Sequence, residues 1–433
     1  MENETIVIQR LVKKEEEGLY FPVEFTVPDQ VEKLEITYTF PRFQEKKDAD
    51  GQIHRIEKNI IDMSLCGAKG VYLGSSGADR SCIMISSYGS SQGYASAEID
   101  PGTWQIILGA YKIQDQGCPV EYTITFYKKN LRLYKGDTHL HTTGSDGNCS
   151  LEEIAQLAMK RGLNYVFVTD HNNYAHNEQL PQSESLTMIP GAEWTHYKGH
   201  AGLLGVKKPF ENPFCVNSPD EMREKIDQAG KRGAVRVIHH PFCPNCGWRW
   251  GMDAVEYDAV EIWNGGNDPL VNRKCLDWWD KQLKNGKRIS ITGGSDFHRA
   301  EYGRILGTPC TCLYAMSRTA TDLTNALKEG HGFIVYDPSG PMAYGQSGNA
   351  LFGDAIDSKS LIHLRFWNLR SGDQILLITD QKQEKISVSD NICEINLERK
   401  AEGIRYLRAE VYRDSVFAGA MPVLITNPFY VYR

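Results

Sequence analysis

Histidines and carboxylates follow five apolar segments between residues 131 and 340, and this repeated pattern constrains the fold more than any other feature of the chain. The polar residues are His139 and His141, Asp170 and His171, Glu193, His239 and His240, and Asp296 and His298. Parallel α/β folds gather the carboxyl ends of their strands at one edge, where loops from several strands build the active site. We therefore expect these side chains to meet at one edge of a sheet or barrel.

Helices with recognisable ends separate the apolar segments. Ser150 and Glu153 form a capping-box pattern before one helix, and Gly162 follows its end. Ser218 and Asp268, each followed by proline, are typical first residues of two more helices. Repeated strand–helix units of this kind predict a parallel sheet or barrel.

The two ends of the chain have a different pattern. Residues 1–130 and 341–433 contain short β-branched and aromatic segments separated by turn residues. We expect a sandwich or jelly-roll at 1–130, a strand–helix domain at 131–340 and a sandwich-like β module at 341–433. A chain of 433 residues is long enough for about three domains.

Composition excludes some functions. The net charge of −7 argues against an extended nucleic-acid surface, and no run of about 18 apolar residues is present to span a membrane. The N-terminal residues lack a basic leader with an apolar core, and the 11 cysteines favour reduced thiols over a disulfide framework. We expect a cytoplasmic protein that acts on a small molecule; the sequence leaves its oligomeric state open.

The first motif is "THLHTTGSDG", which contains His139, His141 and Asp146. Residues i and i+2 of a strand share a face, so both imidazoles can reach one ion. Imidazole and carboxylate ligands together suit zinc, manganese or iron. The alternative for the pair is two polar residues on an edge strand; for Asp170 and His171 it is a helix cap beside a surface histidine.

Further motifs supply more ligand types. Glu193 ends an apolar segment and could bridge two cations, and His200 precedes a segment of its own. Only one of the adjacent His239 and His240 can point inward from a strand. Asp296 shares a face with His298 after two glycines, although the alternative there is a glycine-rich turn.

The order HLH, Asp146, DH, GAE, GH, HP and SDFH resembles the PHP superfamily, named for polymerase and histidinol phosphatase domains. The "GHAGLLG" and "SDFH" contexts, with β modules on both sides, look most like its carbaryl hydrolase-like branch. The resemblance implies an α/β fold with a distorted seven-stranded (β/α) barrel and two or three divalent metal ions at its carboxyl edge.

The resemblance also implies which residues bind each ion. His139, His141, Glu193 and Asp296 match the ligands of one metal. Glu193 would bridge to a second metal held by His200 and His240. Asp146, His171 and His298 would hold a third, although many members have histidine where this chain has Asp146. The expected catalytic residues are His139, Glu193, Asp296 and His298.

The expected reaction is hydrolysis of a phosphate mono- or diester, perhaps of a nucleotide, by a metal-bridging hydroxide. One alternative is a carboxylic ester, amide or carbamate hydrolase that uses the same site. A second alternative is a non-catalytic binding or scaffold protein with a vestigial site. This reaction needs no covalent enzyme intermediate.

Two lesser features lie near the motifs. Arg249, Arg299 and Arg304 could bind a phosphate, and a solvated surface position is the alternative for each. Cys243 and Cys246 have CxxC spacing after His240, but no second pair suits a zinc ribbon. We expect a loop role for these cysteines, with redox chemistry or metal binding as the alternative.

Overall fold

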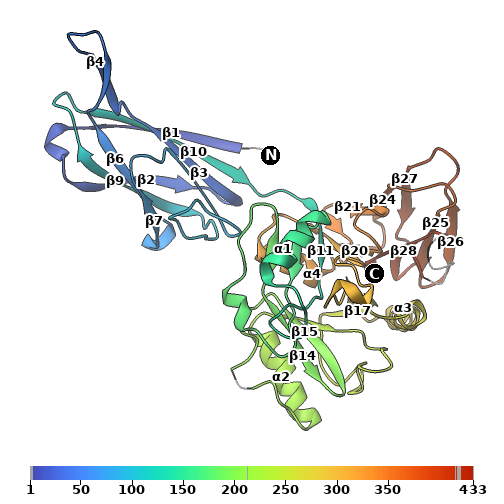
Figure 1. Ribbon diagram of the computed structural model, residues 1–433. Coiled ribbons are helices and arrows are strands. Elements are labelled where there is room, and N and C mark those ends of the chain that lie inside the picture. The colour runs from blue at the N-terminus through green and yellow to red at the C-terminus, as the bar shows by residue number, and fades with distance from the viewer. Residues whose placement is uncertain (1–2, 212, 415, 417–420, 433) are drawn as a thin grey trace. The chain divides into compact units, whose positions relative to one another are not determined.

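The computed structural model describes residues 3–211, 213–414, 416 and 421–432, and it has two compact units, Met1–Asn130 and Leu131–Arg433 (Figure 1). The first boundary agrees with the division expected at residue 130. Each unit is described by itself below.

The first unit consists of two antiparallel four-stranded sheets over one apolar core. One sheet has the order β1 (Asn3–Val12), β10 (Cys118–Lys128), β3 (Val31–Thr39) and β8 (Cys82–Ser86). The other has the order β2 (Tyr20–Val27), β9 (Gly102–Lys112), β6 (Ile60–Cys66) and β7 (Tyr72–Ser76). Alternate residues of both sheets, such as Ile36 and Ile124 from one and Leu65 and Ile106 from the other, share a buried cluster. This arrangement is a β sandwich, as expected from the sequence.

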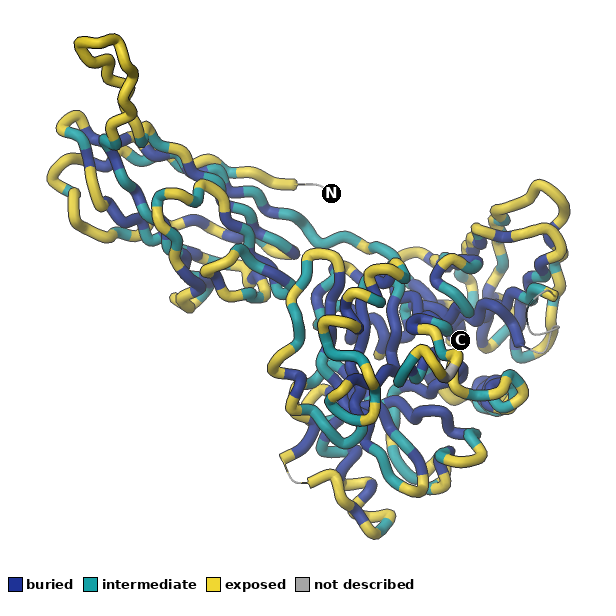
Figure 2. The backbone as a smooth tube through the Cα atoms, in the orientation of Figure 1, coloured by how far each residue is buried: buried dark blue, intermediate teal, exposed yellow. Residues whose placement is uncertain are grey.

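A hairpin of β4 (Phe43–Lys47) and β5 (Ile53–Glu57) belongs to the first unit but buries almost none of its surface (Figure 2). Two short 3₁₀ helices, η1 (Lys14–Glu16) and η2 (Ala68–Gly70), complete the unit.

Three sheets form the second unit. The largest has the order β13 (Thr187–Ile189), β12 (Tyr165–Phe167), β11 (Arg132–Asp137), β19 (Cys310–Ala315), β20 (Gly332–Val335), β29 (Leu424–Thr426), β28 (Tyr406–Tyr412), β25 (Gln374–Thr379) and β26 (Gln383–Ser387), with β23 (Ala355–Asp357) and β30 (Phe429–Tyr432) attached. A five-stranded sheet has the order β14 (Gly191–His196), β15 (Gly199–Leu204), β16 (Val235–Ile238), β17 (Ala259–Asn264) and β18 (Ser290–Gly294). A four-stranded sheet contains β22 (Ala350–Leu351), β21 (Met342–Ser347), β24 (Leu361–Trp367) and β27 (Glu394–Lys400).

The strand directions correct the expectation of a purely parallel sheet. The pairs β11–β12, β12–β13, β16–β17 and β17–β18 are parallel, whereas β14–β15, β15–β16 and β11–β19 are antiparallel. A short turn at residues 197–198, in place of a crossover helix, reverses β15 and so makes both of its pairs antiparallel. The hydrogen bonds of the described strands form separate sheets and do not close a barrel, so the seven-stranded barrel remains a prediction.

Within the described residues, four α helices pack against these sheets: α1 (Leu151–Lys160), α2 (Pro219–Lys231), α3 (Pro269–Lys284) and α4 (Ala320–Glu329). The predicted capping box is confirmed: Glu153 N donates to Ser150 Oγ over 3.2 Å, and Ser150 N donates to Glu153 Oε2 over 2.8 Å. Ser218 and Asp268 cap the next two helices as expected. The short 3₁₀ helices η3 (Ala175–Glu178) and η4 (Ala300–Tyr302) lie in the connections.

Strands from residues beyond 340 continue the largest sheet of the second unit. β29 pairs with β20, and both sides of residue 340 contribute to one buried cluster that includes Phe333, Val335, Leu364 and Phe366. The third module expected from the sequence is therefore not a separate compact unit. None of the described helices has the length and apolar character needed to cross a bilayer.

Candidate metal centre

Two isolated bridges join the largest sheet to the five-stranded sheet beside the predicted motifs. Leu140 pairs with Phe297, and His171 pairs with Glu193. Asp296 N donates to His139 O, and His141 N donates to Phe297 O, both over 2.8 Å. The backbone thus holds the first and last motifs side by side.

Asp137, at the end of β11, connects the two motifs through hydrogen bonds to backbone N–H groups. Its Oδ1 accepts hydrogen bonds from His139 N at 3.1 Å and from Ser295 N at 3.0 Å, and its Oδ2 accepts one from Gly307 N at 2.7 Å. Burial raises the pKa of Asp137, although these donors act in the opposite direction. Sequence reasoning missed this residue; the only signal was an acid directly preceding the first histidine motif.

The first predicted ligand set lies close together and is almost entirely buried. The distance is 3.2 Å from His139 Nε2 to Glu193 Oε1, from His141 Nε2 to Asp296 Oδ1, and between the two Nε2 atoms. An ion with ligands at about 2.1 Å in tetrahedral geometry separates neighbouring ligand atoms by about 3.4 Å. The observed spacing therefore fits a metal ion.

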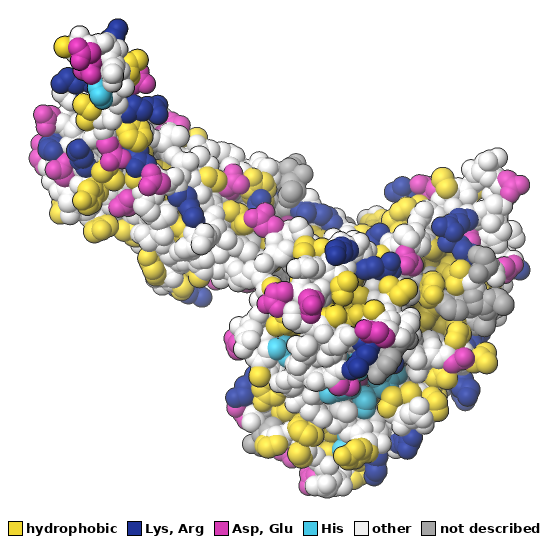
Figure 3. All heavy atoms as spheres, in the orientation of Figure 1, with side chains coloured by type: hydrophobic (Ala, Val, Ile, Leu, Met, Phe, Trp, Pro, Cys, Tyr) yellow, Lys and Arg dark blue, Asp and Glu magenta, His cyan; other side chains and the backbone are white. Residues whose placement is uncertain are grey.

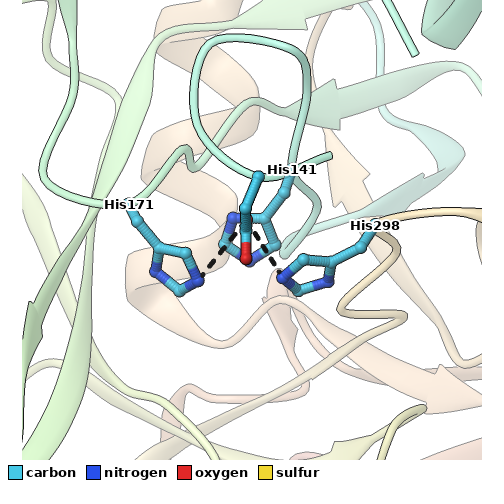
Figure 4. A group of neighbouring side chains, drawn as sticks. His141, His171 and His298 are labelled. Carbon is cyan, nitrogen blue, oxygen red and sulfur yellow. Dashed lines mark ion pairs between the residues drawn. The ribbon is translucent and has the colours of Figure 1, made fainter. Parts of the chain in front are cut away.

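The second and third sets share residues with the first. Glu193 Oε1 lies 3.3 Å from both His200 Nδ1 and His240 Nε2. Asp146 Oδ1 lies 3.3 Å from His298 Nε2 and 3.8 Å from His171 Nε2; Figure 4 shows His141, His171 and His298 turned toward one another, with these ion pairs dashed. All nine predicted ligand residues fall into overlapping groups whose ligand atoms lie within 4.8 Å of one another.

Unpartnered buried atoms supply an independent test of whether a metal fits. Glu193 Oε2 and His200 Nδ1 are buried and form no hydrogen bond of acceptable geometry with described residues. A buried polar atom without a partner costs about 1–3 kcal/mol. A carboxylate oxygen and an imidazole nitrogen can both bind a divalent cation. These residues therefore fit the metal ion that the sequence indicated.

The charges of the cluster favour the ligand states that metals require at Glu193 and His141, but not at His139. Burial opposes ionisation of Glu193, but His139 and its neighbours hold its pKa well below the ordinary value. Burial lowers the pKa of His141 to about 4, so this imidazole is neutral near pH 7. Burial also acts against protonation of His139, yet Glu193, Glu261 and Asp296 raise its pKa well above the ordinary value. A metal ion must therefore displace a proton from His139.

Glu261 on β17 is a buried carboxylate that sequence reasoning missed. Its Oε1 lies 3.0 Å from His139 Nδ1, and its Oε2 accepts hydrogen bonds from His240 N at 2.9 Å and Asn264 Nδ2 at 3.0 Å. A carboxylate on Nδ1 orients an imidazole so that Nε2 is free to bind a metal. The available signal was a single acid inside the otherwise apolar segment "AVEIW".

The adjacent histidines His239 and His240 have different surroundings. His239 Nδ1 lies 2.8 Å from Glu193 Oε1, and its ring stacks on His139 with centroids 3.8 Å apart. His240 has a positive φ of 29°, and Asp296 has one of 51°. Backbone strain of this kind, at two non-glycine residues, is typical of functional sites.

The arginines proposed as substrate contacts lie at unequal positions. Arg249 is exposed and donates to the carbonyl oxygens of Pro244 and Asn245. Arg299 donates to Asp146 O over 2.8 Å. Arg304 lies closer to the ligands, with Nη1 3.0 Å from Asp296 Oδ2. Substrate binding by Arg249 and Arg299 stays a prediction.

A cavity of about 630 Å³ opens beside the cluster. Its lining includes His200, Thr195, Cys246, Phe214 and the highly exposed Tyr197. Figure 3 shows histidine side chains reaching the surface of the second unit among hydrophobic ones. The cluster is thus accessible from one side, which a metal site that only stabilises the fold does not require.

Fold and site together define a class: a mixed α/β protein with several β-sheet modules and a buried site whose overlapping histidine and carboxylate groups suit metal binding. No protein-family model matches the chain. The DNA polymerase/3'-5' exonuclease PolX of Bacillus subtilis is 39% identical over 226 residues, which covers 44% of this chain and 39% of PolX. The chain thus spans about two fifths of that relative's length.

Two further proteins are similar to parts of the chain. An uncharacterised protein of Methanocaldococcus jannaschii is 29% identical over 167 residues, covering 34% of this chain and 93% of that protein. A two-domain protein of Bacteroides vulgatus, which contains a predicted PHP-like metal-dependent phosphoesterase, is 15% identical with a TM-score of 0.38, covering 69% of this chain and 96% of that one. In sequence, part of the chain is similar to part of PolX, and the structure has a histidine-rich, buried candidate metal site.

Proposed function

We propose that the chain hydrolyses a phosphate mono- or diester at this centre. The observation that carries the proposal is the convergence of nine histidines and carboxylates on overlapping groups of ligand size. Burying so many ionisable groups costs folding free energy unless cations compensate their charge, so a purely structural role does not account for them. The similarity of part of the chain to PolX, a DNA polymerase/3'-5' exonuclease, supports the same class of reaction.

The residues would divide among two or three ions. His139, His141, Glu193 and Asp296 would hold one, and Glu193 would share a second with His200 and His240. The third set is Asp146, His171 and His298, of which Asp146 has the most exposed side chain, at 58%. Zinc, manganese and iron all suit these ligands.

Divalent ions in these positions supply Lewis acidity: they make water nucleophilic at neutral pH and stabilise negative charge on phosphate oxygens. The protein contributes positioning. Glu261 orients His139, Asp137 holds the two motifs together, and Arg304 presents a cationic group beside Asp296 and His298. The adjacent cavity would hold the rest of the substrate and exclude part of the bulk water.

A second candidate is hydrolysis of a carboxylic ester, amide or carbamate at the same site, as in the carbaryl hydrolase-like branch that the sequence resembles. Tyr197 and Phe214 at the 630 Å³ cavity favour it, because they offer an aromatic surface to an uncharged substrate.

An assay of paired substrates distinguishes the two candidates. The protein, reconstituted with manganese, zinc or iron, is offered p-nitrophenyl phosphate, bis-p-nitrophenyl phosphate and p-nitrophenyl acetate. The proposal is supported if p-nitrophenol is released from a phosphate ester only when metal is present, and if this activity is lost in Asp296→Ala. The control variant His363→Ala should keep the activity, because His363 is a half-exposed histidine on β24. Hydrolysis of p-nitrophenyl acetate, without hydrolysis of either phosphate ester, favours the second candidate. Phosphatase activity that survives Asp296→Ala contradicts the residue assignment.

A further inference from the structure

Cys243 and Cys246 lie in the loop after His240, and the proposed reaction does not use them. Their Sγ atoms are 3.0 Å apart, and both residues are partly exposed. Cys243 N donates to His240 O at 2.9 Å and Gly247 N donates to Cys243 O at 3.0 Å, so tight turns hold the two thiols together. A disulfide of about 2.05 Å requires the sulfurs to approach by about 1 Å.

A second pair of thiols provides a contrast. Cys310 Sγ and Cys312 Sγ are 3.9 Å apart on β19, and both residues are fully buried. A dissolved reagent cannot reach them without opening of the core. Cys243 and Cys246 instead line a cavity of about 270 Å³, together with Asp296 and Arg304, and Cys246 also lines the 630 Å³ cavity.

The pair also contacts the candidate metal centre. Cys246 Sγ lies 3.6 Å from His240 Nδ1, and the Nε2 of the same ring lies 3.3 Å from Glu193 Oε1. Cys246 forms a group of ligand size with His200 and His240. A sulfur acceptor at Nδ1 would keep the Nε2 lone pair of His240 free for a metal, in the way that a second-layer carboxylate does.

We propose that Cys243 and Cys246 form a reversible redox site, which small-molecule disulfides oxidise, and that oxidation weakens metal binding at His200 and His240. The second part rests on the proposed function. Closing the disulfide draws Cys246 Sγ toward Cys243 Sγ, which would break the 3.6 Å contact that His240 Nδ1 makes with this sulfur. Loss of such a partner weakens metal affinity by about 10–100-fold.

The reaction balances with glutathione disulfide as oxidant. One cysteine thiolate attacks a sulfur of the reagent; a protein–glutathione S–S bond forms, the reagent S–S bond breaks, and one glutathione thiolate leaves. The other cysteine thiolate attacks the protein sulfur of this mixed disulfide and expels the second glutathione thiolate. The protein loses two electrons and two thiol protons, and glutathione disulfide is reduced to two thiols.

Peptide mapping of the full chain tests the redox site. After incubation with glutathione disulfide and alkylation of the remaining thiols, we expect a Cys243–Cys246 disulfide that dithiothreitol reverses. Cys243→Ser and Cys246→Ser should each retain a glutathione adduct, because no second thiol resolves it. Cys215→Ser, which removes an exposed thiol at the 630 Å³ cavity, should still form the disulfide. Absence of the disulfide, or a Cys215–Cys246 bond in its place, overturns the redox site.

Metal retention tests the coupling. Reduced and oxidised protein are dialysed against the same buffered zinc concentration, and bound zinc is measured by mass spectrometry, with circular dichroism to confirm the fold. We expect oxidised protein to require about 10-fold or more free zinc to fill the site. Equal retention in both forms overturns the coupling. Reduced protein that binds no metal overturns the coupling and the proposed function together, whereas the mapped disulfide alone decides the redox site.

Discussion

Glu261→Gln is the substitution that most sharply tests how the protein tunes its candidate centre. The carboxylate accepts from His139 Nδ1 through one oxygen and from His240 N and Asn264 Nδ2 through the other. Glutamine keeps the size of the side chain, but its NH2 group must face one of these donors. In either orientation of the amide His139 loses its negatively charged partner, and in one of them His240 N also loses its acceptor.

The expected effect is on metal affinity. Substitutions of partners in this position cost about 10–100-fold in affinity, which corresponds to about 1.4–2.7 kcal/mol. We expect the dissociation constant measured by competition with a chromophoric chelator to rise within this range. Activity should recover at high metal concentration because the direct ligands are intact.

Glu256→Gln is the matched control, since Glu256 is exposed in the loop before β17. It should leave metal affinity unchanged. An unchanged affinity in Glu261→Gln, with a native circular dichroism spectrum, would refute the positioning role of Glu261.

Other predictions concern the third ion, proton release, metal removal and the junction of the sheets. Asp146→Ala should lower the metal content by about one ion per chain if the third site fills, and an equal content contradicts that site. The raised pKa of His139 means that this imidazole keeps its proton up to a higher pH, and a metal ion must displace that proton. Apparent metal affinity should therefore increase about tenfold per pH unit up to that pKa and level off above it. A metal affinity that stays constant between pH 6 and 8, measured by chelator competition, argues against proton displacement. Excess EDTA should destabilise loaded protein by about 2.7 kcal/mol when metal was present at 100 times its dissociation constant, as thermal unfolding will show; no shift in the melting temperature counts against specific binding. Asp137→Ala leaves three buried N–H groups without an acceptor and should lower the free energy of unfolding by about 3 kcal/mol or more in urea, so a loss under 1 kcal/mol excludes its junction role.

The sequence predicted those parts that depend on local patterns. Capping residues such as Ser150 and Ser218 begin helices where expected, because their hydrogen bonds involve residues only three positions away. The motif residues meet because strand ends share an edge. That conclusion needed only the apolar segments and the residues after them.

The parts that were missed depend on contacts between distant residues. Glu261 is separated from His139 by 122 positions, and no local spacing relates them. The return of the C-terminal strands to the largest sheet likewise depends on the pairing of β20 with β29, which composition does not encode. The direction of β15 was predicted wrongly, as parallel to its neighbours. The connection at residues 197–198 is a tight turn, and the sequence pattern did not distinguish it from a crossover helix.

The number of metal ions per chain tests the central claim most directly. Protein purified without chelators and equilibrated with manganese, zinc or iron is analysed by inductively coupled plasma mass spectrometry against its measured concentration. Two or three ions per chain are predicted, falling by about one in the double variant His139→Ala with Asp296→Ala. Fewer than one ion per chain under every condition would contradict a polynuclear centre.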